Sequence, residues 1–140
     1  MRATDRFQLR PSESDEGRSE LWVSETKLAK LVPGIHLEAQ YAVDDPQKPV
    51  FLLLTSYNSP FEEQIHILLV DDQGHLVEQA QLGGAYAPGI LKDLRVVSSE
   101  RLSFDFQGPV LVTVHPRPRG WLRRSRLDVV RSSNINEGKS

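Results

Sequence analysis

The sequence predicts an all-β protein, an antiparallel β-sandwich with immunoglobulin-like or jelly-roll-like topology. Apolar residues recur mostly at every second position, as on strands with one covered face. Turn-forming residues separate these runs at short intervals. The chain has 140 residues and no cysteine, so it is long enough for one core and has no disulfide framework to replace it. A small barrel fits the same pattern.

The two ends of the chain differ in composition from the middle. Residues 1–20 are polar and charged, which predicts a flexible N-terminal arm with little apolar surface to offset the entropy of ordering. Residues 132–140 are also polar, and predict a disordered C-terminal tail. We expect residues 21–131 to form a single β-sandwich domain, because they contain neither an internal repeat nor a long linker.

At most one short helix is predicted, and the segment that suggests it is at the start of this domain. Ser24 is a suitable cap, and Leu28, Leu31 and Val32 follow at helical spacing. Pro33-Gly34 would end the helix after about two turns.

The rest of the domain predicts about seven to nine short strands. Residues 35–43 alternate as a strand with one solvated face, whereas 50–57 are apolar on both faces and predict a central strand. A hairpin is predicted around Asp71-Asp72-Gln73-Gly74 and a second one around Gln107-Gly108. The remaining strands are expected at residues 64–69, 75–82, 94–97, 102–106, 109–114 and, as an edge strand, 127–130.

No segment predicts secretion or membrane insertion. The longest purely apolar run is Val50 to Leu54, whereas a membrane helix needs about 20 residues. No apolar stretch of signal-peptide length follows the N-terminus. We therefore expect a soluble, cytoplasmic protein without membrane contact.

Motifs for catalysis are incomplete. The absence of cysteine excludes a thiol nucleophile, a zinc ribbon and an iron–sulfur site. There is no Gly-x-Ser-x-Gly motif, and the glycine-rich segment 83–89 lacks the lysine of a P-loop. We therefore predict no catalytic residue and no cofactor. An enzyme with a site assembled from distant strands stays open as a third interpretation.

Metal ligands are also scattered. No two of the four histidines are two or three residues apart, so the sequence predicts no zinc or iron site. The acidic pairs Asp44-Asp45 and Asp71-Asp72 lie in predicted turns. Such turns either supply oxygen ligands to calcium or accept hydrogen bonds from the local backbone. The sequence leaves both interpretations open.

Charge is distributed unevenly along the chain, although the net charge is only −2. Residues 38–82 contain eight acids and one base, whereas residues 115–131 contain six arginines and one acid. The arginines alternate with prolines and surround Trp121, in an extended segment suited to anionic groups. Its arginines either pair with the acidic strands of the same chain or bind a partner. Nucleic acid is not predicted, since the whole chain is slightly acidic.

We therefore predict a non-catalytic interaction module that binds an acidic protein partner or a second copy of itself. The expected contact residues are an aromatic anchor in the glycine-rich loop and a cluster in the basic segment: Tyr86, Arg117, Arg119, Trp121, Arg123 and Arg124. The alternative is a sandwich that binds a small ligand or carbohydrate through the loops near Tyr57, Asn58 and Tyr86.

Overall fold

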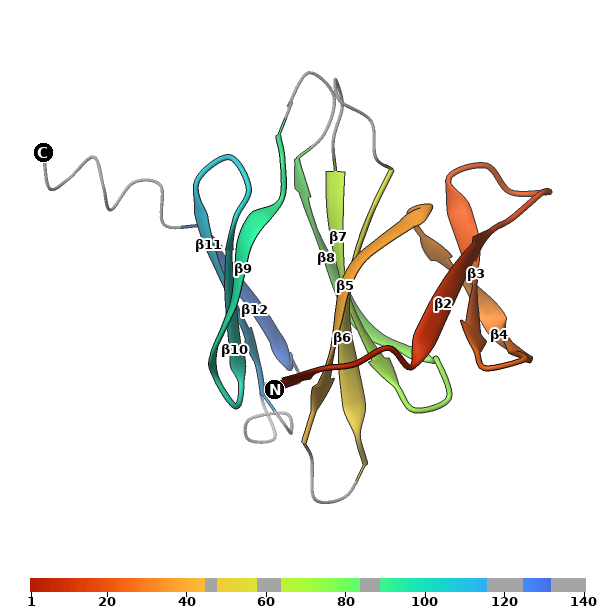
Figure 1. Ribbon diagram of the computed structural model, residues 1–140, viewed down its shortest axis with the longest axis horizontal. Helices are drawn as coiled ribbons and strands as arrows, with labels where there is room; N and C mark the ends of the chain where they lie inside the picture. Colours follow the sequence, from red (N-terminus) through yellow and green to blue (C-terminus); the bar gives the residue numbers. More distant parts are fainter. Residues whose placement is uncertain (45–47, 58–63, 84–88, 116–124, 132–140) are drawn as a thin grey trace, which may run out of the picture.

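The computed structural model describes residues 1–44, 48–57, 64–83, 89–115 and 125–131. Twelve strands occur in this part of the chain, in three antiparallel sheets, and no helix is present there. The prediction of an all-β sandwich is confirmed. The sheets are stacked side by side, so the sandwich has three layers (Figure 1).

Each sheet is built largely from strands that follow one another in the chain. In spatial order, the central sheet contains β1 (Arg2–Ala3), β5 (His36–Val43), β6 (Val50–Ser56), β7 (Gln64–Asp71) and β8 (Leu76–Gly83). The N-terminal sheet contains β2 (Phe7–Pro11), β3 (Arg18–Val23) and β4 (Thr26–Pro33). The C-terminal sheet contains β12 (Leu127–Arg131), β11 (Pro109–Val114), β10 (Arg101–Asp105) and β9 (Lys92–Ser98).

The central sheet is covered on both faces, which explains why β6 is apolar on both sides. Leu52 and Leu54 face a core shared with the C-terminal sheet, whose contributions include Phe104 and Val112. Leu53 faces a second, smaller core shared with the N-terminal sheet. All seven residues of β6 are buried, so the prediction of a doubly covered central strand is confirmed.

Both predicted hairpin turns are present. Asp71 Oδ1 accepts hydrogen bonds from the backbone N–H groups of Gln73 and His75, each at 2.9 Å. In the second turn Gln107 has φ +58° and Gly108 has φ +116°, a pair of positive values that matches the twist of a tight hairpin. Register pairs on both sides of each turn fix the alternation of the adjoining strands.

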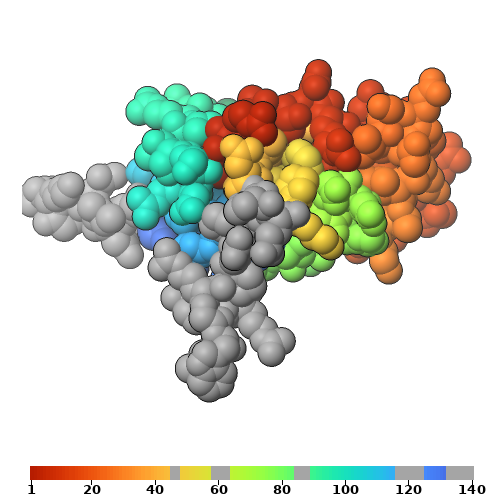
Figure 2. All heavy atoms as spheres, turned by 90° about the horizontal axis from the view of Figure 1, so that it is seen from below, coloured from red at the N-terminus to blue at the C-terminus, as the bar shows by residue number. Residues whose placement is uncertain are grey.

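The N-terminal segment is paired with other strands over most of its length, which differs from the flexible arm expected for residues 1–20. The amino group of Met1 donates to the carbonyl oxygen of Ser99 at 2.9 Å, β1 pairs with β5, and β2 pairs with β3. Figure 2 shows this segment, in red, running from the N-terminal sheet across the central sheet to the teal β9–β10 hairpin. Phe7 is 2% exposed, and burial of its apolar ring stabilises this segment although the residues around it are polar.

The predicted helix at residues 24–34 is wrong, because Thr26–Pro33 form strand β4. The register between β3 and β4 is irregular between Glu20 and Trp22. Extra residues of β4 at this position interrupt the two-residue alternation. Leu28, Leu31 and Val32 therefore have helix-like spacing in the sequence although all three are at least partly buried on a strand.

Strand β5 also differs from the expected strand with one solvated face. Its Tyr41 and Val43 belong to the larger core, as predicted. The opposite face is covered by β2, where the Gln40 amide accepts from the Phe7 N–H and donates to the Phe7 carbonyl, both at 2.9 Å. Among the described residues, no helix is long and apolar enough to cross a membrane.

Candidate functional site

The contact residues predicted from the sequence lie outside the described residues. Tyr86 falls in 84–88, and the five residues of the basic segment fall in 116–124: Arg117, Arg119, Trp121, Arg123 and Arg124. Asn58 is also outside, whereas Tyr57 is described. The prediction for these six contact residues therefore stays a prediction, and the site is built from the residues that flank them.

Polar contacts hold together the two ends of the basic segment, residues 115–126. His115, at the end of β11, is 8% exposed, and its Nε2 lies 2.9 Å from Asp128 Oδ2 on β12. Arg126 Nε donates to the His115 carbonyl oxygen at 2.9 Å. Glu78 on β8 accepts from the Ser125 hydroxyl and from the Arg126 N–H, each at 2.8 Å. The basic segment thus begins and ends at one point, where the C-terminal sheet meets the acidic central sheet.

Charge differs between the stretches of chain that contain two of the sheets. Residues 89–131, which include the C-terminal sheet, contain nine basic and four acidic residues and have a net charge of +5; four of the nine basic residues are in 116–124, outside the described part of the chain. Residues 36–83, which include β5 to β8, contain eight acidic residues and one basic residue. These two layers pack against each other through apolar side chains. Glu78 joins them through hydrogen bonds from the Ser125 hydroxyl and from the backbone N–H of Arg126.

Strand β9 is the longest strand among the described residues in which every residue is exposed, and the sequence gives it no distinctive motif. All seven of its residues are exposed, and it forms one edge of the C-terminal sheet. Leu94, Val96 and Val97 are 37%, 40% and 53% exposed. The clustering of these three apolar residues can be seen in the sequence. Only the strand order shows that this strand has a free edge among the described residues.

A hollow of about 300 Å³ lies between the central and N-terminal sheets. Arg18, His66, Gln79 and Gln81 provide its polar lining. Tyr57, named with the small-ligand alternative, packs edge-on against the His66 ring at 5.2 Å. His66 is 5% exposed, and burial lowers the pKa of its imidazole. In the sequence, His66 is only one of four scattered histidines.

The acidic turn at Asp71 uses its carboxylate locally. Burial alone would raise the pKa of Asp71, but hydrogen bonds from the backbone of His75 and Gln73 outweigh it and lower that pKa. His75 Nδ1 lies 3.1 Å from the second carboxylate oxygen. Asp44, in the other acidic turn, pairs with Arg2 at 2.9 Å. Within the described ranges, no group of three or more histidine, aspartate or glutamate side chains is arranged to hold a metal ion.

Comparison with known proteins adds no relative. No protein-family model matches the chain, and neither the curated proteins nor the solved structures include a match.

Proposed function

We propose that this protein is a non-catalytic interaction module that binds an extended, acidic segment of a protein partner along its C-terminal sheet. One observation carries the proposal: β9 is exposed over its whole length and stands at the edge of that sheet. An edge strand offers unpaired N–H and C=O groups to which an extended peptide can add as a further strand.

Side chains along β9 suit an acidic segment that also carries apolar residues. Lys92 and Arg95 supply positive charge along the strand. Leu94, Val96 and Val97 supply apolar contact area between these charges. In strand addition the main-chain hydrogen bonds provide affinity, and alternate side chains provide specificity.

A second copy of this chain fits the same edge less well. Pairing β9 with its own copy would bring Lys92 and Arg95 of both chains to one edge. Asp93 has φ +58°, and the register between β9 and β10 shifts between Ser103 and Asp105. This irregularity bends the strand near Asp93, as bulges do on protected sheet edges. It leaves residues 94–98 as the stretch available for pairing.

The basic segment leaves the sheet near the same end of β9. The Val114 N–H donates to the Glu100 carbonyl at 2.8 Å, so the end of β11 lies beside the β9–β10 turn. We propose that Arg117, Arg119, Arg123 and Arg124 contact acidic side chains of the bound segment. Trp121 and Tyr86 would act as aromatic anchors.

A displayed peptide library tests the proposal with probes of random sequence. Peptides of about ten residues are selected against the full chain at low salt, and the affinity of the enriched peptides is measured by fluorescence anisotropy. We expect enrichment of peptides that combine acidic and apolar residues. Their affinity should fall steeply as salt is raised.

Two matched variants locate the binding edge. Val97 on β9 and Val130 on β12 are both 53% exposed, and they lie on opposite edge strands of one sheet. We expect Val97→Glu to weaken the selected peptides about tenfold or more and Val130→Glu to change affinity less than about threefold. Enrichment of neutral or basic peptides, or equal losses in the two variants, would contradict strand addition at β9. The same holds if no peptide is enriched.

A further inference from the structure

The hollow between the central and N-terminal sheets follows from their unequal widths. The N-terminal sheet has three strands and the central sheet has five, so the narrower sheet leaves part of β8 uncovered. Gln79 and Gln81 of β8 are exposed on this side, with Leu76 at the start of the strand. Arg18 and Pro33 form the opposing wall from the N-terminal sheet.

His66 lies at the inner wall of this hollow with an unsatisfied polar atom. The residue is 5% exposed, and its Nε2 has no hydrogen-bond partner among the described residues. Buried polar atoms of proteins are nearly always paired, so an unpaired one points to a group that is bound there. The edge-on contact with Tyr57, at 5.2 Å and 87°, holds the ring in place. Burial lowers the pKa of His66, so the imidazole is neutral at neutral pH.

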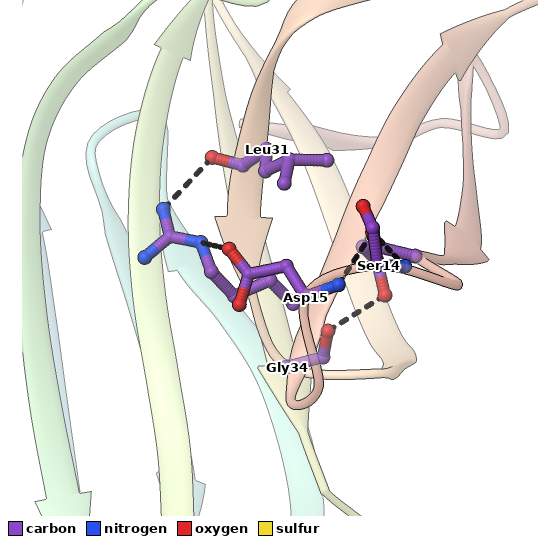
Figure 3. Close-up of polar contacts among 7 residues, drawn as sticks. Ser14, Asp15, Leu31 and Gly34 are labelled. Carbon is purple, nitrogen blue, oxygen red and sulfur yellow. Dashed lines mark hydrogen bonds and ion pairs between the residues drawn. The ribbon is translucent and has the colours of Figure 1, made fainter.

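Arg18 is held at the rim of the hollow by two contacts on one side. Its Nη2 donates to the Leu31 carbonyl at 3.1 Å, and its Nε lies 3.7 Å from Asp15 Oδ2. Figure 3 shows Asp15 and Leu31 on the same side of this guanidinium group, each joined to it by a dashed line. A guanidinium has five N–H donors, so these two contacts leave donors for a ligand.

We propose that this hollow binds a small organic carboxylate. Arg18 is the one charged side chain among the described residues that line it, and a guanidinium matches the planar geometry of a carboxylate. His66 and the amides of Gln79 and Gln81 would pair with further polar groups of the ligand, and Leu76 and Pro33 would contact its carbon atoms. A volume of about 300 Å³ is at the lower end for ligand sites, which fits a molecule the size of a dicarboxylate or a sugar acid.

Histidine ring signals in ¹H–¹³C NMR spectra test this site with defined probes. The chain has four histidines, so His66 can be assigned by loss of its signal in His66→Gln. The probes are succinate, benzoate and glucuronate, with succinamide and glucose as neutral counterparts. We expect at least one carboxylate at about 10 mM to shift the His66 signal, with no shift from its neutral counterpart. His75, whose side chain is 56% exposed, serves as the internal control.

A matched pair of variants separates the hollow from general surface binding. Gln81→Glu places a carboxylate in the hollow, and Gln8→Glu makes the same change on an exposed position of β2. We expect the first variant to weaken carboxylate binding about tenfold or more and the second to leave it unchanged. This pair keeps the test valid if His66→Gln does not fold.

Three outcomes would overturn the inference. They are equal shifts from glucose and glucuronate, equal effects of the two glutamate variants, and no shift of His66 by any probe. The proposed peptide-binding strand is on a different sheet, so Val97→Glu should not alter the response of His66. Loss of peptide binding can therefore be distinguished from loss of carboxylate binding.

Discussion

Replacement of Phe7 by alanine is the sharpest test of how the N-terminal segment is bound. The ring is 2% exposed and packs edge-on against Phe51 at 5.1 Å. Truncation of a buried phenylalanine costs about 3–5 kcal/mol, of which the aromatic pair provides about 0.5–1.5 kcal/mol. Gln40 should continue to bind the backbone of residue 7, so we expect a loss of about 3 kcal/mol in the free energy of unfolding.

Equilibrium unfolding in urea, followed by far-UV circular dichroism, measures this loss. Phe104 is 3% exposed in the larger core, so Phe104→Ala is the matched control for an equally buried ring. Gln8→Ala changes an exposed neighbour of Phe7 and should alter stability by less than about 0.5 kcal/mol. A loss below about 0.5 kcal/mol for Phe7→Ala, beside a full loss for Phe104→Ala, would show that residues 1–11 are an unbound arm.

Three further predictions use the same unfolding measurement. Gly34 has φ +95°, and a Cβ there would lie 2.5 Å from Thr55 Oγ1. Gly34→Ala should therefore lower the free energy of unfolding by about 2 kcal/mol or more. An unchanged unfolding midpoint would contradict this geometry. The buried Ser19 hydroxyl donates to the Gly34 carbonyl at 2.7 Å, as Figure 3 shows at Gly34. Ser19→Ala should therefore lower the free energy of unfolding by about 1–2 kcal/mol. An unchanged free energy would exclude this hydrogen bond. Because burial lowers the pKa of His66 from 6.5, the unfolded chain takes up the proton first as the pH falls below that value. The free energy of unfolding should therefore decrease from about pH 7.5 to about pH 5.5, and His66→Leu should make this pH dependence weaker. The same pH dependence in both proteins would assign it to other groups.

The sequence predicts those parts of the fold in which a local pattern and the tertiary environment agree. Residues 50–56 are apolar on both faces because two layers cover them, and their composition alone reveals this. The hairpin turns at Asp71 and Gln107 use side chains and backbone conformations that are specific to tight turns. No long-range information is needed at either place.

The N-terminal sheet could not be predicted in this way, because β2 and β3 have few fully buried apolar side chains. Phe7 and Leu21 are the fully buried apolar residues of these two strands, and Phe7 lies between Arg6 and Gln8. The irregular register in β4 then gives Leu28, Leu31 and Val32 the spacing of a helix. The composition of a segment reports its average exposure, whereas one buried phenylalanine is enough to fix a short strand against an existing sheet.

The candidate sites are invisible in the sequence for a different reason, since they arise from the number and order of strands. Residues 92–98 differ little in composition from other strands, and they are exposed because no later strand of the sheet is added beside β9 among the described residues. Gln79, Gln81 and His66 border a hollow because a three-stranded sheet covers a five-stranded one. Sequence patterns identify side chains with binding chemistry, such as Tyr86 and the arginines of residues 117–124, on the connections between strands. Uncovered edges and faces depend on how strands are paired over long range. In this fold they place the two proposed binding surfaces at one edge of the C-terminal sheet and between the central and N-terminal sheets.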